Sequence, residues 1–229
     1  MPRLRRVPSR ERPDWMAQAD RLGYDYYRNS DGSFAWREDV RYEFDASALA
    51  LIRKVTETLH DLCLDVVQDA VGREGGLDEF FIPRAVQDTV RQSWQRRDPF
   101  VIGRFDLAWC GGQPKLIEYN ADTPATLPES TRMQTVWHRR RGWPHTHAAL
   151  DAALLTDRLR HLRQKGLIHH TVHIVPYPDN TEDRTHALFY RQWAEEAGLN
   201  AIHCELKDLE IELPRVLWRQ NDPRGKKNS

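Results

Sequence analysis

Residues 101–120 read VIGRFDLAWCGGQPKLIEYN, two runs rich in β-branched and aromatic residues on either side of a Gly-Gly pair. Such runs are typical of strands, and glycines between them are typical of a tight turn. We therefore predict a β-hairpin whose arms are residues 101–110 and 115–120. If its loop is the three residues Gly111–Gln113, Cys110 faces Pro114 across the hairpin.

This register gathers four polar residues on one face of the hairpin. Counting back from the loop places Asp106 opposite Glu118 and Arg104 opposite Asn120, because side chains alternate across a strand. Two facing carboxylates destabilise a sheet unless a positive charge lies between them. That charge can be a divalent cation, since carboxylate and amide oxygens suit Mg²⁺. Alternatively, Arg104 pairs with both carboxylates on an exposed face, and a shift of one residue would remove the cluster.

Outside the hairpin, the spacing of apolar residues predicts a mixed α/β protein with helices around the hairpin sheet. Apolar residues recur every three or four positions after Asp45 and again after Pro83, as in amphipathic helices. A strand, a helix and a strand near the C-terminus indicate a parallel βαβ unit. The expected helices cover 15–22, 45–72, 83–98, 129–139, 147–164 and 184–197, the last strands cover 172–176 and 201–206, and a turn covers 29–33.

The composition excludes several classes of protein. Lys and Arg number 34, as do Asp and Glu, so the zero net charge gives no reason to expect nucleic acid or an anionic membrane as a partner. No window approaches the roughly 18 to 20 consecutive apolar residues of a membrane span. Three widely spaced cysteines fit neither a disulfide framework nor a CxxC metal site. We therefore expect a soluble protein of the cytoplasmic type.

The hairpin and the segment after it resemble one enzyme family. Residues 103–130, GRFDLAWCGGQPKLIEYNADTPATLPES, followed by Gln134 and Trp137, are similar to the glutathionylspermidine synthase family, whose synthetase domain is a variant of the ATP-grasp fold. The resemblance implies an ATP-dependent ligase that joins a carboxylate to an amine. ATP activates a glutathione-like carboxylate as an acyl phosphate, and a polyamine-like amine attacks it to form an amide.

The resemblance also implies roles for the hairpin residues. Asp106, Glu118 and Asn120 correspond to Mg²⁺ ligands, and Arg104 corresponds to the catalytic arginine that contacts the phosphoryl group, so that Arg104 and Asp106 lie at the ATP. An acyl phosphate and its tetrahedral adduct concentrate negative charge. A divalent cation and a guanidinium are therefore the groups that such a step needs.

Three further residues are expected to bind the substrates. Thr123 matches a position that contacts glutathione, although Ala125 stands where the family often has a second hydroxyl residue. Glu182 and Asp183 correspond to adjacent acidic residues that meet the polyamine. The alternatives are loop-to-helix packing for residues 121–130, and stabilisation of a helix N-terminus by the two acids.

The resemblance suggests domain limits. We expect a solvated basic arm over 1–12, a pre-ATP-grasp region over 13–206 and a basic, non-matching tail without helical or strand periodicity over 207–229. The nucleotide-binding lysines of the family would follow residue 206. We therefore predict an incomplete ATP-grasp-like domain. As a truncated ligase, the chain is expected to have impaired turnover or none. The alternatives are a non-catalytic binding or regulatory remnant, and a ligase for a different acid or amine. An incomplete domain is also expected to expose apolar surface and self-associate.

Overall fold

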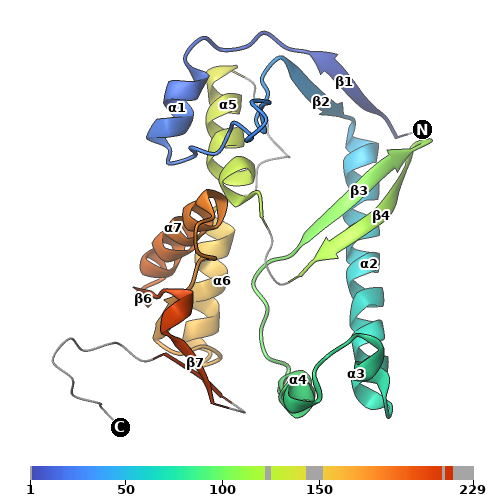
Figure 1. The fold of residues 1–229 in the computed structure, drawn as a ribbon. Coiled ribbons are helices and arrows are strands. Elements are labelled where there is room, and N and C mark those ends of the chain that lie inside the picture. The colour runs from blue at the N-terminus through green and yellow to red at the C-terminus, as the bar shows by residue number, and fades with distance from the viewer. Residues whose placement is uncertain (1, 122–124, 143–151, 213–214, 219–229) are drawn as a thin grey trace, which may run out of the picture. The chain divides into compact units, whose positions relative to one another are not determined.

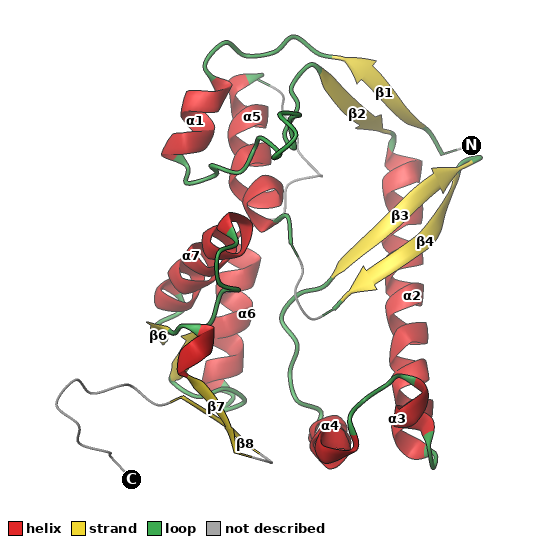
Figure 2. Ribbon diagram, viewed as in Figure 1, coloured by secondary structure: helices red, strands yellow, loops and turns green. Residues whose placement is uncertain are grey.

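The computed structural model describes residues 2–121, 125–142, 152–212 and 215–218 of the 229-residue chain. These residues form a mixed α/β protein (Figures 1 and 2). Each of its sheets has two strands. The chain divides into two compact units, residues 1–63 with 101–155 and residues 64–100 with 156–229. No helix in the described ranges is long and apolar enough to cross a lipid bilayer.

The first unit contains the predicted hairpin and the start of the predicted long helix. Asp45 caps this helix as expected, because its Oδ1 accepts a hydrogen bond of 2.7 Å from the Ala48 amide. The elements that begin in this unit and are placed by the structure are β1 (Leu4–Pro8), α1 (Trp15–Arg21), β2 (Val40–Phe44), α2 (Ala46–Gly72), β3 (Arg104–Cys110), β4 (Gln113–Asn120), the π-helix η1 (Glu129–Met133), α5 (Gln134–Arg140) and α6 (Ala152–Gln164).

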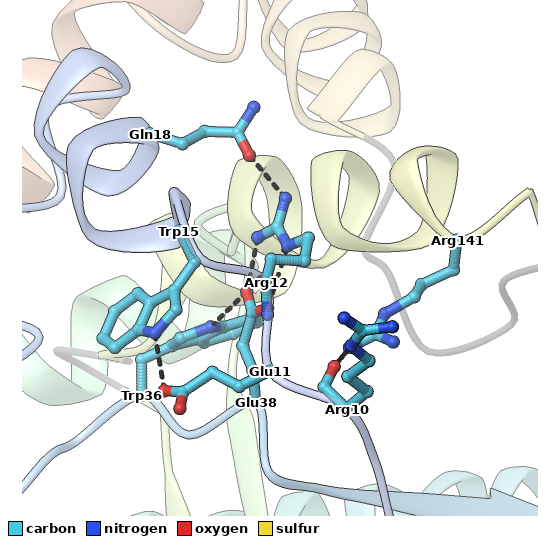
Figure 3. Close-up of polar contacts among 8 residues, drawn as sticks. All are labelled: Arg10, Glu11, Arg12, Trp15, Gln18, Trp36, Glu38 and Arg141. Atoms are coloured by element: carbon cyan, nitrogen blue, oxygen red, sulfur yellow. Dashed lines mark hydrogen bonds and ion pairs between the residues drawn. The ribbon is translucent and has the colours of Figure 1, made fainter.

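The segment expected as a solvated arm is instead part of the fold. β1 pairs antiparallel with β2, from Leu4 opposite Phe44 to Pro8 opposite Val40. Beyond β1, the Arg12 side chain is only 10% exposed and forms an ion pair with Glu38, which is fully buried (Figure 3). The charges of residues 1–12 predicted solvation, but a partner strand and a buried carboxylate supply the contacts that order this segment.

An aromatic core holds the first unit together. Trp15, Ala19, Tyr24, Trp36 and Met133 are all buried in it, and further tyrosine, phenylalanine and tryptophan side chains pack around them. The rings meet edge to face, as between Trp15 and Tyr27, whose centroids are 5.2 Å apart. Such pairs are worth about 0.5–1.5 kcal/mol beyond the burial of their area. The core therefore joins α1, the turn at 29–33 and the helical segment that follows the hairpin.

The second unit contains the predicted βαβ arrangement. β5 and β6 pair in parallel and α7 connects them, which confirms that prediction. Ala194, Ala197 and Leu199 form a small core with side chains from α6 and both strands. The elements that begin in this unit are α3 (Gly76–Glu79), α4 (Arg84–Arg96), β5 (Thr171–Ile174), α7 (Thr181–Glu196), β6 (Asn200–His203), the 3-10 helix η2 (Leu206–Asp208), β7 (Leu209–Glu212) and β8 (Arg215–Trp218).

The C-terminal segment departs from the expectation of no regular structure. β7 and β8 pair antiparallel, with Leu209 opposite Trp218 and Glu212 opposite Arg215. The alternation of leucine or isoleucine with glutamate over 209–212 spans only four residues. A run so short is a weak period-2 signal, and the pairing becomes evident only once both strands are seen together.

Candidate active site

The β3–β4 hairpin closes with two residues rather than three. Cys110 pairs with Gln113, and Gly111 and Gly112 have φ of +59° and +81°. Positive φ at both central residues is what the tight hairpin turn of type I′ requires, and glycine adopts it without strain. The expected pairing of Cys110 with Pro114 is therefore wrong.

A β-bulge then restores the predicted register at the other end of the hairpin. Leu107 pairs with Leu116 and Asp106 with Glu118, which leaves Ile117 as the extra residue of β4. Without the bulge, Ile117 would face Asp106 and the Glu118 side chain would point to the opposite face. Asp106 thus lies opposite Glu118, as predicted, although a two-residue turn and a bulge produce this register.

The four predicted residues of the hairpin share one face, which we call the acid face (Arg104, Asp106, Glu118 and Asn120). Arg104 lies opposite Asn120. Arg104 Nε donates to Asp106 Oδ1 at 2.8 Å, and Nη2 donates to Asp106 Oδ2 and to Glu118 Oε1, both at 3.2 Å. The hydrogen bond to Asp106, followed by the charge of Asp106 and the contact with Glu118, raises the pKa of the Arg104 guanidinium. Arg104 therefore pairs with both carboxylates, and the three charged side chains together keep a net charge of −1.

The acid face stays accessible to a ligand. The side chains of Arg104, Asp106 and Glu118 are 27%, 39% and 54% exposed. Within the described ranges, no group of three or more His, Cys, Asp and Glu side chains is placed to hold a metal ion. The hairpin instead offers two carboxylates and one amide oxygen, hard ligands that fit Mg²⁺ when water and phosphate oxygens fill its other positions.

The opposite face of the hairpin is aromatic, a feature that was not predicted from the sequence. Phe105 lies directly opposite Tyr119, and their rings stack with centroids 3.9 Å apart. His60 of α2 contacts the Tyr119 hydroxyl at 3.0 Å through Nδ1. Burial, and then the charge of Cys63, raise the pKa of Tyr119. The available signal was the shared pattern of RFD and EYN, each with an aromatic residue between two polar ones.

The segment after the hairpin begins with an unusual backbone. Thr123 lies outside the described residues, so its predicted role stays a prediction. Thr126 has φ of +69°, which is rare for a β-branched residue. The chain then enters η1, where Glu129 Oε2 accepts a hydrogen bond of 3.1 Å from the Tyr26 hydroxyl. Single π-turns and strained residues are frequent at functional sites.

The two acidic residues predicted for the amine lie in the second unit, in the first turn of α7. Asn180 caps this helix by accepting a hydrogen bond of 3.1 Å from the Asp183 amide. Asp183 Oδ2 accepts one of 3.2 Å from the Tyr177 amide. Glu182 lies beside it and is partly buried. The Asp183 carboxylate therefore links the first turn of α7 to the loop before it. A role for Glu182 or Asp183 in binding an amine stays a prediction.

Comparison with known proteins gives a family match over most of the chain. The family model described as glutathionylspermidine synthase pre-ATP-grasp matches residues 6–224. This range extends beyond both ends of residues 13–206, the region predicted from the resemblance.

Individual relatives are ligases or synthetases by name. A Haemophilus influenzae protein provisionally named an acid–amine ligase is 36% identical over 55% of this chain and 32% of its own length. Trypanothione synthetase of Crithidia fasciculata is 29% identical over 66% of this chain and 23% of its own. The bifunctional glutathionylspermidine synthetase/amidase of Escherichia coli is 25% identical over 80% of this chain and 29% of its own. The chain thus spans at most about a third of the length of these relatives.

Proposed function

The chain belongs to the glutathionylspermidine synthase pre-ATP-grasp family. From this premise we propose that its function is that of an ATP-dependent ligase, which joins a carboxylate to an amine. The reaction would transfer the terminal phosphoryl group of ATP to the carboxylate, releasing ADP. The amine would then attack the acyl carbon, and phosphate would leave as the amide forms. The observation that supports this proposal is the convergence of Arg104, Asp106, Glu118 and Asn120 on one accessible face of the hairpin.

Arg104 is the residue we propose to act on the phosphoryl group. Its bonds to the two carboxylates use Nε and Nη2, so Nη1 has no bond to any described residue. A guanidinium held in this way keeps its orientation while one edge stays available for a phosphate oxygen. Arg104 would thereby stabilise the negative charge that develops during transfer.

The carboxylates of Asp106 and Glu118, together with the Asn120 amide oxygen, are the groups we propose to hold Mg²⁺. The bound ion would neutralise charge on the phosphate oxygens of ATP. A glutathione-like acid near Thr123, and a polyamine-like amine near Glu182 and Asp183, remain the proposed substrates, supported by the names of the relatives. A cytoplasmic location is proposed with them, because the substrates are soluble metabolites.

Calorimetric titration with ATP in the presence and absence of Mg²⁺ tests the proposal. We expect Mg²⁺-dependent binding to the unaltered chain, weaker binding by Glu118→Gln or Asp106→Asn, and weaker ATP affinity in Arg104→Met. Asp88→Asn is the matched control, since Asp88 is 90% exposed on α4. Equal binding by all these variants would contradict the assignment of the acid face.

A second candidate function is binding without turnover. The observation that favours it is that Arg104 already pairs with both carboxylates, so a positive charge lies between them without a bound cation. In this case glutathione or spermidine should bind equally well with and without EDTA. Mass spectrometry should then detect no amide product after incubation with ATP, Mg²⁺ and both substrates.

A further inference from the structure

Behind the acid face, the middle residues of the two motifs are in direct contact. Phe105 stands between Arg104 and Asp106, and Tyr119 stands between Glu118 and Asn120. The Phe105 and Tyr119 rings stack almost in parallel, at 12°, and they are cross-strand partners. Neighbouring residues of a strand point to opposite faces. The aromatic pair therefore lies on the other face of the hairpin, between the Arg104–Asn120 and Asp106–Glu118 pairs along the strands.

His60 connects the aromatic pair to α2. Its Nδ1 lies 3.0 Å from the Tyr119 hydroxyl, and the two rings meet nearly edge to face at 83°. Figures 1 and 2 show the hairpin alongside α2, where this contact forms. Residues 60 and 119 both belong to the first unit. The contact is a side-chain link between the hairpin strands and the long helix.

Gly103 leaves the space that the Tyr119 ring occupies. A Cβ atom on residue 103 would lie 2.6 Å from Tyr119 Cε2 and 2.8 Å from its hydroxyl oxygen. Both separations are shorter than any normal contact. The Tyr119 ring thus passes over the backbone of Gly103, just before β3, to reach His60. The contact between Tyr119 and His60 therefore requires that residue 103 has no side chain.

The hairpin needs such a link for a physical reason. A two-stranded hairpin is only marginally stable by itself, the bulge at Ile117 interrupts the ladder next to Asp106, and facing carboxylates oppose the pairing. Ile117 and Leu116 are 66% and 44% exposed, so they bury little surface at the bulge. Beyond the bulge, the Phe105–Tyr119 stack and the contact of Tyr119 with His60 therefore support the register together with the hydrogen bond from Arg104 to Glu118.

We propose that His60, Phe105 and Tyr119 are positioning residues that keep Asp106 opposite Glu118 and orient Arg104 between them. This inference rests on the proposed function for its biological meaning, because the positioned groups are the proposed phosphoryl and Mg²⁺ ligands. The arrangement of the acid face can nevertheless be measured without any ligand.

The test follows the Arg104 side chain by nuclear magnetic resonance. The Nε proton of Arg104 donates to Asp106, so its exchange with water reports whether the acid face is ordered. We expect Tyr119→Phe and His60→Ala each to accelerate this exchange by about 2- to 10-fold, the range that corresponds to the loss of one hydrogen bond. The double variant should exchange no faster than either single variant, because both substitutions remove the same contact.

Two controls separate positioning from general destabilisation. Tyr42→Phe removes a hydroxyl from an exposed tyrosine of β2 and should leave the exchange unchanged. Melting followed by circular dichroism identifies any variant that unfolds, and Tyr119→Phe keeps the ring and its stack even if His60→Ala does not fold. Unchanged Arg104 exchange in a folded Tyr119→Phe would overturn the proposal, as would independent effects that add in the double variant.

Titration with Mn²⁺, as a spectroscopic substitute for Mg²⁺, distinguishes the two hypotheses. If the unaltered chain binds no Mn²⁺ while Arg104 exchange responds as expected, the proposed function fails and the positioning role stands. If Mn²⁺ binds, the Tyr119→Phe variant should bind it more weakly and the Tyr42→Phe variant should not. Equal Mn²⁺ affinity in Tyr119→Phe and the unaltered chain would overturn the positioning role at the metal ligands.

Discussion

Replacing Arg12 by alanine should destabilise the first unit more than any substitution of an exposed charge. Arg12 Nε lies 3.1 Å and 2.8 Å from the two carboxylate oxygens of Glu38, and the rest of its guanidinium bonds to Glu38 and to Gln18, as Figure 3 shows. Glu38 is fully buried. After the substitution, the carboxylate would keep two donors among the described residues, the Trp36 indole and the backbone amide of residue 12, both at 3.3 Å.

The expected loss follows from the charge left behind. Removing one partner of a buried ion pair costs about 3–5 kcal/mol, because the other charge stays buried without compensation. This is a large part of the roughly 5–15 kcal/mol that stabilises a typical domain. Replacing both partners, as in Arg12→Met with Glu38→Leu, should recover most of the loss, since apolar residues of similar volume need no compensation.

Urea unfolding followed by tryptophan fluorescence measures these differences, because Trp15 and Trp36 belong to the core next to the pair. Arg37→Ala is the matched control. It breaks an ion pair with Asp39 whose side chains are 54% and 47% exposed, and we expect little change. A loss below about 1 kcal/mol in Arg12→Ala would refute the reasoning, because a buried unpaired carboxylate costs more than that.

Three other predictions concern glycines and a helix cap. Gly103→Ala should lower stability by about 1–3 kcal/mol, because the new methyl group overlaps the stacked Tyr119 ring; an unchanged urea midpoint would contradict this. Gly111 has φ of +59°, which asparagine tolerates better than a β-branched residue. Gly111→Val should therefore lower the free energy of unfolding by more than about 1 kcal/mol, and Gly111→Asn by less. Equal urea midpoints for the two variants would argue against a turn that depends on glycine. The hydrogen bond from Ser47, and then that from the Ala48 amide, lower the pKa of Asp45. The ionised Asp45 cap therefore stabilises α2 above about pH 4, and this stabilisation is lost as the pH falls through the pKa of Asp45 in the folded state. The difference in melting temperature between the unaltered chain and Asp45→Ala should therefore shrink as the pH is lowered below about 4.

Features that depend on neighbouring residues were predictable from the sequence. α2 begins after Asp45 and ends at Gly72, as the apolar spacing and the cap predict. The parallel unit of β5, α7 and β6 was also predictable, because each element carries its own periodicity. Helix and strand periods and capping residues act over a few positions, so these short-range signals can be recognised in the sequence alone.

The hairpin shows where such reasoning reaches a correct pairing by an incorrect route. Counting from a three-residue loop placed Asp106 opposite Glu118, and the structure places it there through a two-residue turn and a bulge at Ile117. One residue assigned to the loop is equivalent in register to one residue inserted into the strand. Sequence alone does not distinguish the two, because the position of a bulge depends on which face is covered by other elements.

The sequence by itself determined the long helix, the hairpin with its acidic and amide side chains, and the family to which they belong. Only the tertiary structure decided that Arg12 reaches a buried carboxylate 26 positions away, that a strand forms from a charged N-terminal run, and that His60 meets Tyr119 across 59 positions. The physical reason is that these contacts depend on the path of the chain. The residues around a charged or aromatic side chain in the sequence do not show whether that side chain is solvated or buried. Its partner is determined by packing between distant segments.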